Sequence, residues 1–157
     1  MDLERIDPFA EAVVNVLTTM AFTTPHPGEV FQKEHDEPSQ GDVTAIIGLT
    51  GPVNGSMSIS FSENAILQIV SNMFGEACKA IDGEVQDAVG ELCNMISGDA
   101  RRALGEKGMQ FQAAIPTIVC GKGHRISHAG SGPSTVVPFQ VGEDALFFVE
   151  ICFDDSL

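Results

Sequence analysis

The sequence predicts a single domain of the α/β (α+β) class, built from a helix-plus-three-strand unit that occurs twice. Two long segments, 3–22 and 83–108, have apolar residues at helical spacing. Each is followed by short segments that are alternately or continuously apolar, which is typical of strands. A length of 157 residues fits one domain with a true hydrophobic core. Residues 1–157 are therefore expected to form one domain.

The first half is predicted to contain a helix, three strands and a second helix, at 3–22, 29–33, 43–49, 54–61 and 65–74. Pro8 fits a first helical turn, so the first helix proper is expected to begin near Asp7. The polar stretch 34–41 is expected to be a loop. Ser62 is a suitable start for the second helix, and Gly75 is a suitable end.

The second half is predicted to contain a long helix followed by three strands, at 83–108, 109–120, 134–140 and 144–153. Gly108 is expected to end the helix. The segment 121–133, which is rich in Gly, Ser and His, is expected to be a loop. In the doubled arrangement, helix 3–22 is the counterpart of helix 83–108, an expectation that depends on the order of the elements and not on residue identity.

The chain is strongly acidic, with 22 Asp and Glu against 8 Lys and Arg and a formal net charge of -14. Such a charge repels phosphate backbones and anionic membrane surfaces, so neither nucleic acid nor a membrane is an expected partner. The acidic start has no basic segment followed by an apolar one, so no secretory signal and a cytoplasmic location are expected. The four cysteines lack CxxC or CxxH spacing, which favours reduced thiols over a zinc site or disulfides.

Asp87, Glu91 and Asn94 fall within about 60° of one another on helix 83–108, and are expected to point away from the core. Gly98 falls on the same stripe and Gly90 at its margin, although a glycine inside a helix costs about 1 kcal/mol relative to alanine. The lack of a side chain at these two glycines suits the close approach of another molecule. The alternative explanation is that the glycines only make room for helix packing. The opposite side carries the expected core residues Val85, Val89, Leu92, Ile96 and Ala103.

This stripe can position other groups, but it cannot supply a nucleophile or a strong base, because no His, Ser or Lys lies beside it. Asn94 both donates and accepts hydrogen bonds, which suits it to orient a water molecule. Phosphoryl hydrolysis depends mostly on such positioning and on electrostatics. Glu91 suits a contact with a cation on a partner. The alternative is a solvated acidic face, on which Asp87 and Glu91 slightly destabilise the helix.

Other polar residues are weaker candidates. Arg101 follows the stripe and is a candidate for holding an acidic or phosphorylated partner, as is Arg102; pairing with the nearby Asp99 or Glu106 is the alternative. His124 and His128 share the expected loop 121–133, where a metal site or an anion site formed by backbone amides is possible and an ordinary surface loop is preferred.

Four segments resemble those of the CheC, CheX and FliY family of phosphatases. In DAVGELCNMISGDARRAL an acidic residue precedes Glu91 by four positions and Asn94 follows it by three, as in the family signature. PFAEAVVNVLTTMAF near the start, and GKGHRIS followed by VVPF near the end, resemble the CheX branch. The resemblance covers nearly the whole chain and implies a CheC-like fold, in which helices pack on a mainly antiparallel sheet.

That family dephosphorylates the phosphoaspartate of the response regulator CheY, so the implied partner is a phosphorylated CheY-like regulator. The resemblance implies that Glu91 engages the regulator's conserved lysine and that Asn94 places the hydrolytic water. Asp87 stands at the leading position of the motif without an assigned part, and Pro116 is taken as structural. No metal or cofactor of the chain's own is implied, because Mg²⁺ is expected in the regulator's active site.

The CheX branch also implies one site per chain and a homodimer formed through the sheet. Members of the CheC branch carry a second Glu and Asn pair on the other helix, but here Glu11 and Asn15 are four residues apart instead of three. Strands 134–140 and 144–153 are candidates for the dimer interface. Two other functions stay open: a non-catalytic module that binds the regulator, and an enzyme with its own metal, which would need the histidines to converge.

Overall fold

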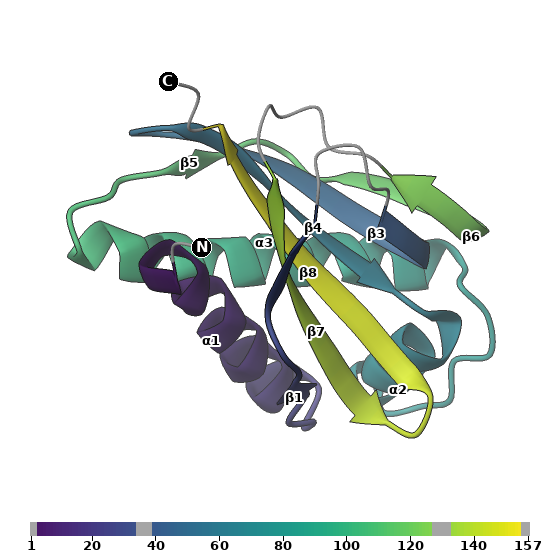
Figure 1. Cartoon of the computed structure of the whole chain (residues 1–157). Coiled ribbons are helices and arrows are strands. Elements are labelled where there is room, and N and C mark those ends of the chain that lie inside the picture. The colour runs from purple at the N-terminus through teal and green to yellow at the C-terminus, as the bar shows by residue number, and fades with distance from the viewer. Residues whose placement is uncertain (1–2, 34–38, 127–132, 155–157) are drawn as a thin grey trace.

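The computed structural model describes residues 3–33, 39–126 and 133–154. The elements in chain order are α1 (Leu3–Met20), β1 (His26–Pro27), β2 (Phe31–Lys33), β3 (Ser39–Thr50), β4 (Asn54–Phe61), α2 (Glu63–Phe74), α3 (Gly83–Glu106), β5 (Gln112–Ala113), β6 (Thr117–Ile126), β7 (Ser134–Gly142) and β8 (Ala145–Asp154). The three helices of these segments lie on one side of an antiparallel sheet (Figure 1). Their apolar faces and one face of the sheet form a single buried core.

The sheet has the doubled arrangement predicted from the order of elements. Its strand order is β1-β7-β8-β4-β3-β5, with β2 also paired to β7 and β6 also paired to β3. Within each half the last two strands pair with each other, β3 with β4 and β7 with β8. The first strand of each half crosses over, so β2 pairs with β7 and β6 with β3. The halves join where β4 pairs with β8, which confirms the repeat at the level of architecture.

Helix α1 begins at Leu3, earlier than expected, and Pro8 is therefore an interior residue and not part of the first turn. Because proline has no N–H, Pro8 cannot donate the usual helical bond to the carbonyl oxygen of Glu4. Lys107 Nζ donates to that oxygen instead, at 3.5 Å. This bond joins the start of α1 to the end of α3.

The ends of α2 and α3 are those that the sequence predicted. Ser62 caps α2, its Oγ accepting a bond from the Ala65 N–H at 3.2 Å, and Gly75 ends it in the left-handed region with a φ of 72°. The side chain of Asp82 caps the start of α3 in the same way. Gly108 follows the end of α3 with a φ of 87°. A glycine adopts this conformation without the strain of a side chain, so it terminates the helix.

The sheet edge that contains β6 differs most from the secondary structure that the sequence predicted. β3 begins at Ser39 and β6 continues to Ile126, so residues 39–41 and 121–126 belong to strands and not to loops. The expected strand 109–120 is interrupted, with only 112–113 and the residues from 117 onward in strands. The β6 side chains are mostly exposed, and an exposed edge strand has no apolar pattern that would mark it in the sequence.

Strands β7 and β8, the candidates for a dimer interface, lie inside the sheet. β8 pairs with β4 and β7, and β7 pairs with β8 on one side and with β1 and β2 on the other. Their backbone edges are therefore used, and only a face of these strands is left for a second copy. A homodimer stays a prediction.

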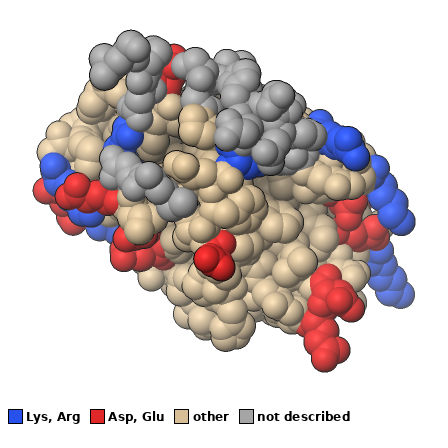
Figure 2. Space-filling view, viewed as in Figure 1, with Lys and Arg blue, Asp and Glu red and all other residues tan. Residues whose placement is uncertain are grey.

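Charged side chains in the view of Figure 2 lie mostly along the edges, and the centre of this face carries few of them. Among the described residues, no helix combines the length and the apolar character that a bilayer span requires.

Candidate functional site

Helix α3 presents Asp87, Glu91 and Asn94 to solvent, all three exposed, as predicted. Helix α3 packs on the sheet and on α2, and α1 packs beside it. Ala103, expected on the core face, is only half-buried. The buried residues of α3 are Val85, Ala88, Val89, Leu92, Cys93, Ile96, Ser97, Ala100 and Leu104. We refer to the line of Asp87, Glu91 and Asn94, which are exposed, with the half-buried Gly98 and Arg101, as the α3 ridge.

The side chains of Glu91 and Asn94 are available to another molecule. Neither makes a hydrogen bond or an ion pair with any residue in the described part of the chain. Asn94 therefore keeps its carboxamide acceptor and two donors, and Glu91 keeps its carboxylate oxygens. An exposed side chain with unused polar groups can position a water molecule or contact a cation on a partner, but it is not held in place by its own fold.

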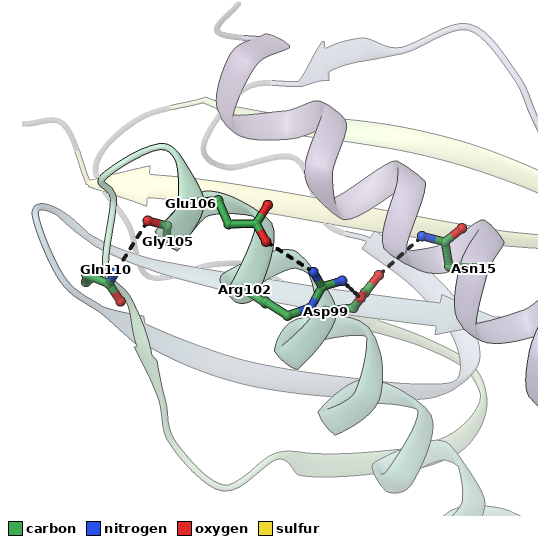
Figure 3. A network of polar contacts seen from close by, with 6 residues as sticks. All are labelled: Asn15, Asp99, Arg102, Gly105, Glu106 and Gln110. Atoms are coloured by element: carbon green, nitrogen blue, oxygen red, sulfur yellow. Dashed lines mark hydrogen bonds and ion pairs between the residues drawn. The ribbon is translucent and has the colours of Figure 1, made fainter.

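Asn15, which would match Asn94 in a second site, takes part in helix packing. Its Nδ2 donates to Asp99 Oδ2 on α3 at 3.4 Å (Figure 3). Asp99 also accepts a bond from Arg102, which lies 3.5 Å from Glu106. The hydrogen bond and charge of Asp99, with the charge of Glu106, raise the pKa of Arg102. The pairing alternative for Arg102 is therefore confirmed, and the described residues offer a Glu and Asn pair at the family spacing on α3 alone.

The two glycines of α3 have different surroundings. A Cβ added at Gly90 would lie 3.5 Å from Cδ1 of Ile118, so this glycine faces β6. A Cβ added at Gly98 would meet only an Nη atom of Arg101, at 3.8 Å. Arg101 bends back toward Gly98, and its Nε donates to Oγ of the buried Ser97 at 3.2 Å. Helix packing is thus the better account of Gly90, whereas Gly98 leaves open surface on the ridge.

A groove lies beside the N-terminal half of the ridge, between α2 and α3. Phe74, the last residue of α2, is 40% exposed there. Sequence reasoning missed this residue, because Phe74 follows the buried Val70 by four positions and so has the spacing of the core face. The groove is lined by Met73, Phe74, Glu76, Glu84, Asp87, Ala88 and Glu91. We refer to these residues as the α2–α3 groove.

The remaining candidates do not form a catalytic group. Cys93 is buried, and burial raises the pKa of its thiol to about 12, so a thiolate nucleophile is not available at neutral pH. His124 has partners for both ring nitrogens, with Nε2 2.7 Å from Thr44 Oγ1 and Nδ1 2.7 Å from the Gly121 oxygen. His128 lies outside the described residues. In the described segments, no three His, Cys, Asp or Glu side chains gather as ligands for a metal ion.

Comparison with known proteins identifies the family. The family model described as "Chemotaxis phosphatase CheX" matches residues 43–140, which include the whole motif on α3. The crystal structure of a chemotaxis protein CheX from Desulfovibrio desulfuricans is 43% identical with a TM-score of 0.89, covering 96% of this chain and 99% of that chain. The chain belongs to the CheX family. The resemblance seen in the motif is thereby confirmed, and at the family level CheX proteins are chemotaxis phosphatases.

Two further solved structures bear on this CheX-family chain. A CheC-like superfamily protein from Shewanella sp. PV-4 is 41% identical with a TM-score of 0.90, covering 98% of this chain and 99% of that chain, which confirms the CheC-like fold. A CheX-CheY-BeF3-Mg²⁺ complex from Borrelia burgdorferi contains a chain 28% identical with a TM-score of 0.81, covering 96% and 97%. Comparison with curated protein sequences found no match.

Proposed function

We propose that this CheX-family protein hydrolyses the aspartyl phosphate of a CheY-like response regulator, with Glu91 and Asn94 as its catalytic side chains. The observation that carries the proposal is the exposed pair on α3, whose polar groups no described residue engages. The Borrelia burgdorferi relative in complex with CheY supports the choice of partner. A non-catalytic module of the same fold is the alternative, and it would gain nothing from a carboxamide at position 94.

Asn94 acts by holding a water molecule in line with the bond that breaks. Its carboxamide oxygen accepts a hydrogen bond from the water, and the water oxygen attacks phosphorus. The bond between phosphorus and the aspartyl oxygen breaks, which releases inorganic phosphate and restores the regulator's carboxylate. Mg²⁺ held in the regulator's own site neutralises charge on the phosphoryl oxygens when it is bound. Positioning accounts for most of the rate gain in such a reaction.

Glu91 acts by docking the regulator, through a charge-assisted contact with a lysine near the phosphorylation site. A contact of this kind contributes about 1.5–3 kcal/mol once water is excluded. Asp87 adds negative charge one turn earlier, and Gly98 and Arg101 extend the contact surface in the other direction. Gly90 faces Ile118 of β6 and is left out of this binding surface. The working form we propose is a cytoplasmic homodimer whose residues 1–157 act as one domain.

Replacing Asn94 tests the proposal directly. Asn94→Ala should lower kcat for phosphate release from a purified phosphorylated CheY-like domain by about 100-fold, because a misplaced nucleophile costs about that much. Binding of the regulator and the melting temperature should stay as in the wild type, since Asn94 is exposed and makes no bond within the described chain. Retained activity in the variant would remove Asn94 from the mechanism. Binding without hydrolysis, in the wild type as well, would favour the non-catalytic module.

A further inference from the structure

We propose that the α2–α3 groove is a second docking surface for the regulator, which receives an apolar side chain flanked by basic residues. This proposal rests on the proposed function for the identity of the partner. The groove combines two features that solvent alone does not explain: an exposed aromatic ring and a set of unneutralised carboxylates. It also shares Glu91 with the ridge, so a molecule that contacts Glu91 lies at the end of the groove.

The apolar part of the groove comes from the end of α2. Phe74 is 40% exposed, although the other apolar residues of α2 are buried or packed against the core. Met73, which also lines the groove, is partly buried and packs against the core. Gly75 stops α2 directly after Phe74, with a φ of 72°. The last turn of the helix therefore leaves apolar surface uncovered beside the site. An aromatic side chain at the centre of a contact is a frequent source of binding energy.

The polar part of the groove is entirely acidic. Its charged lining residues are Glu76, Glu84, Asp87 and Glu91, with no Lys or Arg among the lining residues. None of these four carboxylates forms an ion pair with a residue in the described segments. Such a surface is complementary to a basic one and would repel an acidic segment. The occupant that fits both parts is therefore an apolar side chain of the regulator with Lys or Arg beside it.

The position of the groove fixes which step it affects. The groove lies on the N-terminal side of Glu91, and Asn94 is on the other side, so a side chain against Phe74 does not touch the reacting atoms. Such a contact is the same before and during the reaction, which makes it uniform binding energy. The loss of uniform binding raises KM and leaves kcat unchanged. This pattern is the opposite of the one expected for Asn94.

The test compares Phe74→Ser with a matched apolar control. Leu3 is similarly exposed, at 46%, and it precedes Glu4, whose oxygen accepts a bond from Lys107. Lys107 lies about 24 Å from Glu91 along the helix axis at the usual rise per residue. Phe74→Ser should raise KM for the phosphorylated regulator about 10-fold with kcat within about twofold of the wild type. Leu3→Ser should change neither, and Phe74→Leu should restore most of the affinity.

A second variant covers the case in which Phe74→Ser does not fold. Glu84→Gln removes one exposed charge at the start of α3, and it should lower kcat/KM and weaken its dependence on salt concentration. The proposal is overturned if Phe74→Ser and Glu84→Gln both match the wild type, or if Phe74→Ser lowers kcat at unchanged KM. Should the wild type bind the regulator without hydrolysing it, the same variants are compared by Kd. A 10-fold weaker Kd for Phe74→Ser then supports the groove although the proposed activity is wrong.

Discussion

At the scale of single residues, the site contains two neighbouring arginines with different surroundings. Arg102 is engaged by Asp99 and Glu106, so its charge is already satisfied within the helix. Arg101 uses its Nε to bond Ser97, and its guanidinium lies near Gly98 on the ridge. The sequence placed both arginines beyond the motif but could not distinguish them, because side-chain direction depends on which neighbour offers the better bond. Of the two arginines, Arg101 is the one with no carboxylate partner among the described residues.

The difference between the two arginines predicts different effects on the proposed reaction. Arg101→Ala should raise KM for a phosphorylated CheY-like regulator about 3- to 10-fold, because it removes a cation from the ridge. Arg102→Ala should change KM less than about twofold, since exposed ion pairs of its kind contribute little. Arg101→Lys should recover part of the loss, which a purely structural role would not explain. Steady-state phosphate release at two salt concentrations measures these effects, and equal KM values for the two alanine variants would contradict the assignment.

At the scale of elements, helices α2 and α3 show what the helical periodicity of the sequence predicts and where it fails. The 3.6-residue repeat placed Asp87, Glu91 and Asn94 on the solvent side correctly, because a long helix has one core face and the rest must be exposed. Ser62 and Gly75 also marked the two ends of α2 correctly, and Gly108 follows the end of α3. Periodicity failed at Phe74, which has core spacing but lies past the last turn that the core covers. Local sequence patterns specify which face of a helix points toward the core, but they do not specify how much of the helix the other elements cover.

The two glycines of α3 make a test at the same scale. Gly90→Ala and Gly98→Ala should each raise the free energy of unfolding by about 0.5–1 kcal/mol, because alanine favours the helix and an added Cβ meets nothing closer than 3.5 Å at either site. Gly98→Ala should also raise KM for the regulator, since it adds a methyl group to the open ridge. Gly90→Ala should leave KM unchanged, because it faces Ile118. Urea unfolding and phosphate-release kinetics check both. Unchanged kinetics for Gly98→Ala would show that close approach of a partner does not require this glycine.

At the scale of the whole molecule, the sequence predicted the doubled unit but not its exchange of strands. The order of helices and strands can be predicted from patterns along the chain, and the structure confirms it. The crossing of β2 to β7 and of β6 to β3 brings together strands that are distant in sequence, and no local signal records such pairing. The second part of the exposed edge strand β6, residues 121–126, was taken for a loop for a related reason, because strand patterns depend on a buried face that β6 largely lacks.

A buried ion pair on the sheet face opposite the helices joins two strands that are distant in sequence. Lys33 on β2 and Glu150 on β8 are 2.5 Å apart across β7, with side chains 9% and 2% exposed. Removing one charge of a buried pair costs about 3–5 kcal/mol, whereas replacing both with apolar residues is often neutral or stabilising. Glu150→Gln should therefore lower the free energy of unfolding by several kcal/mol, and the double variant Lys33→Met with Glu150→Leu should recover most of it.

Urea unfolding of the wild type, Lys33→Met, Glu150→Leu and the double variant measures this coupling as a double-mutant cycle. Because β2 and β8 present the pair on the face away from α3, kcat and KM of the folded fraction should be unchanged in all four proteins. An additive cycle would mean that the two charges stabilise the fold independently of each other. A change in kcat at full folding would instead couple the far face of the sheet to the ridge, and the separation of the stabilising face from the face that carries Asn94 would be wrong.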